Sequence, residues 1–289
     1  MDRRRYLVAY TDIKIDVIAD GQGAPLVLLP SSSRDSEDFD DVAERLAAAG
    51  FLVLRPQPRG MLGSVGPIVG ITQHDLARDV AEVIRHANAG PAIVVGHAYG
   101  QWVGRTVAAD FPALVRGVVL AAASARSSAP ELAAALLRGA NPALPTAERL
   151  AALQFAFFAP GHDPRPWLAG WHPAVTPMQR AATAATPRAQ WWTAGRAPVL
   201  DIQAALDPWR PPGTENDFRD DLGAGRVSVI VIPDASHALF PEQPAALVDA
   251  ILAWTGSTHR FLAPNQRRRY TAPFVRPVGI GGTSTRTLT

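Results

Sequence analysis

Short apolar runs alternate with amphipathic stretches along most of the chain. The runs are rich in Val, Ile and Leu, which is typical of strands buried on both faces. Such strands are predicted at 25–30, 51–55, 92–95, 118–122 and 227–233, and a further sheet segment begins at 197. Helical spacing is found at 38–48, 72–88, beyond 100 and at 244–254, and an antiparallel hairpin is predicted from 6–9 and 14–18. Because strands and helices alternate, the sequence predicts an α/β fold with a mostly parallel sheet flanked by helices.

A tight corner separates one of these strands from the helix that follows it. The apolar run 92–95 ends at Gly96, and the apolar positions take up helical spacing only after Gly100. Between them the chain reads Gly96-His97-Ala98-Tyr99-Gly100. A corner this short forces its central residue into a strained backbone conformation, and glycines let the strand and the helix approach each other closely. We therefore expect Ala98 at the tip of the corner, above the carboxyl end of the sheet.

The corner resembles the nucleophile elbow of the α/β-hydrolase superfamily, which reads G-x-S-x-G. Gly96 and Gly100 match this motif, but Ala98 stands where the superfamily has its serine. A methyl group cannot attack a carbonyl carbon, so this chain has no serine nucleophile at the elbow. The alanine is either an engineered replacement or the native residue of a relative with altered or no chemistry. The resemblance covers about residues 6–255 and implies an α/β-hydrolase fold with a helical cap insertion.

Two further residues match catalytic positions of the superfamily. Asp207 follows the sheet segment that begins at 197 and precedes a proline, as the acid of the triad does in relatives. His237 follows the strand predicted at 227–233, in the place of the triad histidine. The chain order of elbow, acid and histidine is the one that this fold uses. Asp201 is a weaker candidate for the acid because it lies within the strand, where an unpaired carboxylate is costly.

The resemblance also implies an oxyanion hole made of two backbone amides. In relatives one amide belongs to the residue after the nucleophile, here Tyr99, and the other to the loop after the strand at 25–30. We align Ser32 with this second donor. Relatives usually carry His-Gly in this loop, whereas this chain has Pro30-Ser31. The loop is therefore predicted either to supply the oxyanion donor or to be a serine-rich turn that caps the next helix.

A different pattern fills residues 124–196. Ala-rich helical segments alternate with Pro-rich breaks, and aromatic side chains concentrate there. In the superfamily a helical cap over the catalytic pocket is inserted at this point. We interpret 1–123 and 197–255 as the core domain, 124–196 as the cap and 256–289 as a basic, flexible tail. Aromatic residues at helical spacing are often core residues, but so many on a small cap predict a pocket roof for an apolar or aromatic substrate. The predicted substrate contacts are Phe155, Phe158, Trp167, Trp171 and Trp192.

Composition and charge argue against several other classes of protein. The chain has 289 residues, 47% of them hydrophobic, and no cysteine, so it forms neither a disulfide nor a thiolate metal site. Residues 256–289 hold six arginines and no acidic residue. Because the net charge of the whole chain is +2, residues 1–255 carry a net charge of about −4. A folded part with this mildly acidic charge offers no evident surface for nucleic acid. No apolar stretch reaches the roughly 20 residues of a membrane span. With no secretory signal, metal-ligand cluster or phosphate loop, we expect a cytoplasmic protein without a cofactor or metal. Its expected partner is a small-molecule substrate, and a homodimer is one option.

These residues leave three functions open. The first is a hydrolase scaffold for a small apolar or aromatic ester or lactone, without its serine nucleophile. In the second, His237 and Asp207 act as a base on water or on an acidic carbon, which gives a serine-independent hydrolase, a lyase or cofactor-free chemistry. The third is a ligand-binding protein that keeps the fold without catalysis. The intact pair of Asp207 and His237 counts against the third.

Overall fold

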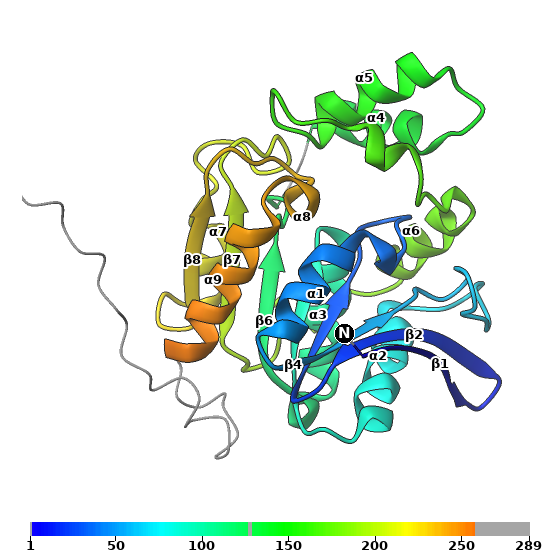
Figure 1. Cartoon of the computed structure of the whole chain (residues 1–289), viewed down its shortest axis with the longest axis vertical. Coiled ribbons are helices and arrows are strands. Elements are labelled where there is room, and N and C mark those ends of the chain that lie inside the picture. The colour runs from blue at the N-terminus through cyan, green and yellow to red at the C-terminus, as the bar shows by residue number, and fades with distance from the viewer. Residues whose placement is uncertain (1, 127–128, 258–289) are drawn as a thin grey trace, which may run out of the picture.

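The computed structural model describes residues 2–126 and 129–257. An eight-stranded sheet runs through the molecule and carries helices on both faces (Figure 1). Its strands are β1 (Arg3–Tyr10), β2 (Ile13–Gly21), β3 (Ala24–Leu29), β4 (Phe51–Pro56), β5 (Ala92–His97), β6 (Val115–Ala121), β7 (Val199–Ala204) and β8 (Val227–Ile232). The helices are α1 (Asp40–Ala48), α2 (Gln73–Ala87), α3 (Tyr99–Asp110), α4 (Pro130–Ala140), α5 (Thr146–Ala156), α6 (Thr176–Ala184), α7 (Asp217–Leu222), α8 (Leu239–Glu242) and α9 (Pro244–Ser257). The basic tail predicted at 256–289 lies, apart from residues 256 and 257, outside the described residues.

The strands are ordered β1-β2-β4-β3-β5-β6-β7-β8 in the sheet. β1 and β2 form the predicted antiparallel hairpin, and β2 also pairs antiparallel with β4. From β4 through β3 to β8 all neighbours are parallel, which confirms the mostly parallel α/β sheet predicted from the sequence. Because parallel strands end at the same edge of a sheet, the loops after β3, β5, β7 and β8 meet there.

Alternate side chains of the central strands belong to two separate hydrophobic cores, one on each face of the sheet. Val27 and Leu29 of β3 join the cluster that α2 and α3 cover. Leu26 and Leu28 of the same strand join the cluster under α1 and α9. Side chains of a strand point to opposite faces in turn, so a strand between two helical layers is apolar at every position. This explains why the sequence shows continuous apolar runs rather than alternation.

The helices of the core domain begin and end close to the predicted positions. α2 starts directly after Thr72, whose backbone N–H donates to Asp75 Oδ2 at 2.8 Å in a capping box. A 3-10 turn at Ser36–Phe39 precedes α1, so the regular helix begins two residues later than predicted, at Asp40. The short helix α7 was not predicted. Within the described ranges, no helix combines the length and the apolar character that a membrane crossing requires.

Between β6 and β7 the chain leaves the sheet for the predicted helical insertion, residues 124–196. Figure 1 shows α4 and α5 beyond the carboxyl ends of β6 and β7, and α6 nearer to the sheet. The first part of the insertion has a small core of its own, formed by α4, α5 and the segment that follows them. Ala238, from the loop after β8, belongs to that same cluster. The insertion therefore packs against the loop that carries His237.

Candidate active site

Ala98 lies at the tip of the corner between β5 and α3. Its backbone has φ 47° and ψ −110°, a conformation that costs a non-glycine residue about 1–3 kcal/mol. The corner can be this tight because two neighbours lack a side chain. A Cβ on Gly96 would lie 2.3 Å from the Cα of Gln101, and one on Gly100 would lie 2.3 Å from the carbonyl oxygen of Leu29. The chain therefore keeps the strained geometry of an elbow although the residue at its tip carries only a methyl group.

His237 and Asp207 form a buried acid–base pair. His237 Nδ1 lies 3.0 Å from Asp207 Oδ2 and 3.1 Å from Oδ1, although the two residues are 30 positions apart in the chain. The backbone N–H of Trp209 donates to Asp207 Oδ1 at 2.9 Å and helps to orient the carboxylate. An Nδ1–H that donates to a carboxylate leaves Nε2 as the acceptor of a neutral imidazole. No residue in the described ranges forms a hydrogen bond with this Nε2.

His97, next to Ala98 in the elbow, holds the backbone of the histidine loop. Its Nε2 lies 2.7 Å from the carbonyl oxygen of His237. Burial, with a smaller contribution from the neighbouring His237, lowers the pKa of His97 to about 3, so His97 is neutral and Nε2–H donates. The bond ties the loop after β8 directly to the elbow. His97 was not singled out from the sequence, and its position beside the elbow was the available signal for this role.

A second anchor of the histidine loop is the buried carboxylate of Glu242. Glu242 Oε2 accepts from the backbone N–H of Ser236, and Oε1 accepts from the N–H of Ala159 in the insertion, both at 2.6 Å. The backbone N–H of Ala238 in turn donates to the carbonyl oxygen of Phe157 at 2.7 Å. The insertion and the histidine loop are thus joined on both sides of His237. Sequence reasoning did not identify Glu242, because its two partners are distant or backbone groups.

Ala98 and His237 line the same cavity, whose volume is about 460 Å³. Ser32 and Tyr99, the residues predicted to supply the oxyanion donors, line it as well. In the part of the chain that the structure describes, neither of their backbone N–H groups donates a hydrogen bond to protein. Asp207 lies behind His237 and is not part of the lining. The structure therefore brings together the five residues predicted for the elbow, the acid–base pair and the oxyanion hole.

The five predicted substrate contacts lie elsewhere. Phe158 and Trp167 are buried in the core of the insertion, and Trp171 packs against that core. Phe155 is 57% exposed, and Trp192 packs against Phe218 of α7. None of the five is in the cavity lining, whose aromatic residues are Tyr99, Trp102 and Trp209. The small helices of the insertion need apolar side chains for a core of their own, and Phe157, Phe158 and Trp167, which follow α5, fill that core.

Trp209 is placed to influence the histidine itself. Its ring stacks on that of His237 with centroids 5.1 Å apart, and its Nε1 donates to the carbonyl oxygen of Ala156 at 2.7 Å. Trp209 thereby connects the acid loop, the histidine and the insertion. Its position two residues after Asp207 was a sequence signal that could have marked it, as the position of Trp102 on the elbow helix could have marked that residue.

The loop after β3 is held in place by the insertion. Gln179 of α6 accepts hydrogen bonds at Oε1 from the Ser32 hydroxyl at 2.8 Å and from the backbone N–H of Ser33 at 3.0 Å. The hydroxyls of Ser33 and Thr176 lie 2.6 Å apart. The backbone N–H of His172 donates to the carbonyl oxygen of Ser33 at 2.7 Å. The shape of the predicted oxyanion loop therefore depends on segments about 140 residues away in the sequence.

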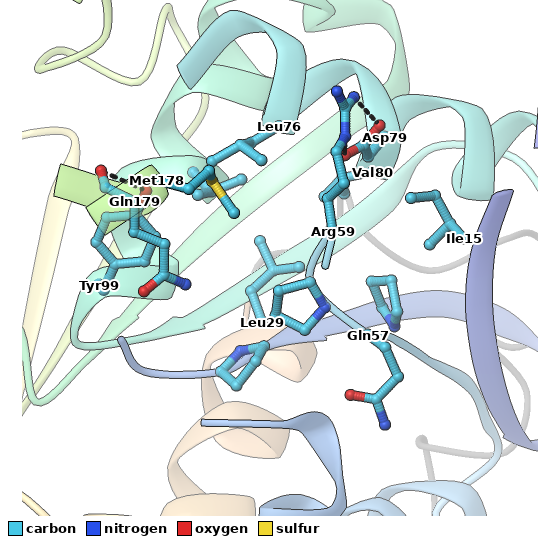
Figure 2. Close-up of a pocket in the computed structure, with 14 residues that line it drawn as sticks. Ile15, Leu29, Gln57, Arg59, Leu76, Asp79, Val80, Tyr99, Met178 and Gln179 are labelled. Carbon is cyan, nitrogen blue, oxygen red and sulfur yellow. Dashed lines mark hydrogen bonds and ion pairs between the residues drawn. The ribbon is translucent and has the colours of Figure 1, made fainter. Parts of the chain in front are cut away.

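Tyr99 and Gln179 also line a second, smaller cavity of about 50 Å³ (Figure 2). Its walls are mainly apolar, from Leu29, Val103 and Met178, and the Arg59–Asp79 ion pair lies at one side. A space of this size accommodates a water molecule or a small alkyl group. The described residues contain no group of three or more His, Cys, Asp or Glu side chains arranged to hold a metal ion.

The comparisons with known proteins agree with the fold. A family model described as the alpha/beta hydrolase family matches residues 26–250. The chain belongs to the alpha/beta hydrolase family. Within this family it is 30% identical over 225 residues to BpoC of Mycobacterium tuberculosis, which carries a provisional name as a non-heme bromoperoxidase. That alignment covers 73% of this chain and 85% of BpoC.

Two further comparisons, one with a crystal structure and one with a curated sequence, show what this member of the alpha/beta hydrolase family is similar to. The crystal structure of BpoC superimposes with a TM-score of 0.71 at 25% identity, covering 86% of this chain and 97% of that one. A 2-(acetamidomethylene)succinate hydrolase of Mesorhizobium japonicum is 34% identical over 107 residues, which span 37% of this chain and 38% of the relative. Relatives of the chain thus include a hydrolase and a protein named as a haloperoxidase.

Proposed function

We propose that this chain is a hydrolase scaffold for small ester- or lactone-type substrates whose acyl-transfer machinery is complete except for the nucleophile. The observation that carries the proposal is the placement of His237. Its Nδ1 is held by Asp207, while its ring lines the cavity beside Ala98 and its Nε2 has no partner among the described residues. With serine at position 98, the imidazole would take the hydroxyl proton and Asp207 would stabilise the resulting imidazolium.

The other parts of the cavity suit a carbonyl substrate. The N–H groups of Ser32 and Tyr99 have no acceptor among the described residues, and both residues line the cavity together with Ala98, as the proposed role of oxyanion donors requires. The rings of Tyr99, Trp102 and Trp209 supply apolar surface, and the volume of about 460 Å³ suits a small molecule. We assign the role of a cap over the site to the insertion, whose α6 contributes to the wall.

A fluorophosphonate probe tests this assignment directly, because it phosphorylates only an activated serine nucleophile and releases fluoride. The chain as it stands is expected to remain unlabelled. Ala98→Ser is expected to gain one label per chain, located at residue 98 by peptide mass spectrometry. Ala98→Ser combined with His237→Ala is the control and is expected to lose the label. An Ala98→Ser protein that folds but stays unlabelled would contradict the proposal.

A second candidate function is favoured by one specific observation. The methyl group of Ala98 leaves the Nε2 side of His237 open to the cavity, so the imidazole is free to act on a water molecule or on an acidic carbon of the substrate. Such chemistry needs no covalent intermediate. It requires an oriented base, and the bond to Asp207 supplies the orientation.

Replacing His237 by alanine in the unmodified chain distinguishes this candidate. If water activation is the native chemistry, any slow hydrolysis of phenyl acetate by the Ala98 protein is expected to fall to the uncatalysed rate in His237→Ala. His74→Ala removes a partly exposed imidazole that does not line the cavity, and is expected to leave the rate unchanged. Equal rates in all three proteins would exclude a His237-dependent reaction of this ester.

A further inference from the structure

The charged side chains that line the main cavity are all positive. The described residues that line it include two arginines, Arg126 and Arg180, and no aspartate or glutamate. Arg126 is compensated, because its guanidinium pairs with Asp221 at 2.5 Å and lies 3.6 Å from Asp217. Arg180 of α6 forms no ion pair or hydrogen bond with any described residue. The wall formed by α6 therefore presents an uncompensated positive charge to whatever enters the cavity.

A neutral donor lines the same cavity as this charge. Gln179 is 2% exposed and lines the same cavity. Its Oε1 must be the atom that faces Ser33, because the backbone N–H of Ser33 can only donate. The amide is thereby fixed in one orientation, and its Nε2 donates to no acceptor in the described ranges. Because Gln179 lines the cavity, this amide nitrogen is available to an acceptor on a ligand. Figure 2 shows the Gln179 side chain next to Tyr99.

We propose that the cavity takes an anionic substrate, an ester or lactone whose acyl part carries a carboxylate, with Arg180 as its counter-charge and Gln179 Nε2 as a hydrogen-bond donor to it. This inference rests on the proposed function. The guanidinium and the amide are both donors, and a carboxylate is the common organic group that accepts from several donors at once. The hydroxyl of Ser124 on the same lining adds a further donor, whereas the hydroxyl of Thr183 already donates to the carbonyl oxygen of Gln179. A neutral substrate would give Arg180 no counter-charge.

Arg180 and Gln179 would act on binding rather than on the chemical step. A contact to a part of the substrate remote from the reacting carbonyl stabilises the bound substrate and the transition state alike. Losing it raises KM and leaves kcat nearly unchanged. Because Arg180 is exposed to solvent, salt is expected to weaken its contribution.

The test compares two 4-nitrophenyl esters of similar chain length, the singly charged glutarate and the neutral valerate, in the Ala98→Ser protein. We expect kcat/KM to be about five- to tenfold higher for the glutarate, through a lower KM. Adding Arg180→Gln is expected to abolish this preference, and Arg180→Lys to keep part of it. Arg188→Gln is the matched control: it removes the same charge from a residue that lines a neighbouring groove beside Trp192 but not the main cavity, and it should keep the preference.

The possible results separate the two proposals. Equal hydrolysis of both esters by Ala98→Ser would overturn the anionic substrate class while leaving the hydrolase assignment in place. A preference that is lost equally in Arg180→Gln and Arg188→Gln would show a general field of the protein and would also overturn it. Hydrolysis of neither ester would contradict the proposed function and, with it, this inference.

Discussion

Replacing Ala98 by serine is expected to raise kcat/KM for short aryl esters by at least about 10³. In a comparable enzyme the loss of the triad serine costs on the order of 10⁶ in turnover, so restoring it has a large range to recover. The new hydroxyl would start from a backbone already at φ 47°, so no rearrangement of the elbow is required. It would project toward a cavity that His237 also lines. Initial rates with phenyl acetate, measured over a range of concentrations, provide the comparison.

Ala125→Ser is the matched control for this experiment. Ala125 is buried and lines the same cavity, but it lies after β6 and not at the elbow, so a hydroxyl there has no acid–base pair aligned with it. This variant is expected to stay at the level of the unmodified chain. If Ala98→Ser and Ala125→Ser gain equally little while both fold normally, the scaffold does not support serine-based acyl transfer.

Replacing Gly100 by alanine is expected to destabilise the protein by about 3 kcal/mol or more. The added Cβ would lie 2.3 Å from the carbonyl oxygen of Leu29 and 2.6 Å from that of Pro30. Both atoms belong to backbone, so neither can turn aside as a side chain could, and helix α3 or the end of β3 must move. For a chain of this size the loss corresponds to a fall in Tm of roughly 6 °C or more. Thermal unfolding followed by circular dichroism measures it.

Gly104→Ala, one turn further along α3, is the control for that substitution. Its Cβ would meet side-chain atoms instead, at 3.1 Å from Val94 Cγ1 and 3.7 Å from Leu29 Cδ1. Alanine is also the better helix former by about 1 kcal/mol, which offsets part of the crowding. We expect the stability to change by no more than about 1 kcal/mol. A Gly100→Ala protein as stable as Gly104→Ala would show that β3 and α3 are not in the close contact described.

The elbow was predictable because its signals are local. Gly96 and Gly100 mark where a buried strand ends and a helix begins, and the strained φ at Ala98 follows from the short distance between them. Asp207 and His237 were identified in the same way, from their positions directly after sheet segments. Because β7 and β8 are parallel, the loops after them lie at the same edge of the sheet. This arrangement places His237 Nδ1 3.0 Å from Asp207 Oδ2, although the two residues are 30 positions apart.

The direction of the aromatic side chains could not be read from the same patterns. Trp167 and Phe158 have the spacing of a pocket roof as much as that of a core, and in the folded chain they fill the core of the insertion. Trp102 and Trp209 instead reach the cavity, from the core domain. Which way an aromatic ring of an Ala-rich helix points depends on the partner that covers it, and hydrophobic periodicity does not name the partner.

By itself, the sequence determined the family, the order of the strands and helices, and the residues at the elbow and after β7 and β8, because motifs and periodicity are properties of neighbouring positions. Only the tertiary structure decided the environment of these residues. Some of the hydrogen bonds join positions 140 or more apart. One runs from His97 to the carbonyl oxygen of His237, and two run from Ser32 and Ser33 to the side chain of Gln179. The first of these bonds forms only when the sheet brings the ends of β5 and β8 together, and the other two only when the insertion has docked, so no local pattern records them.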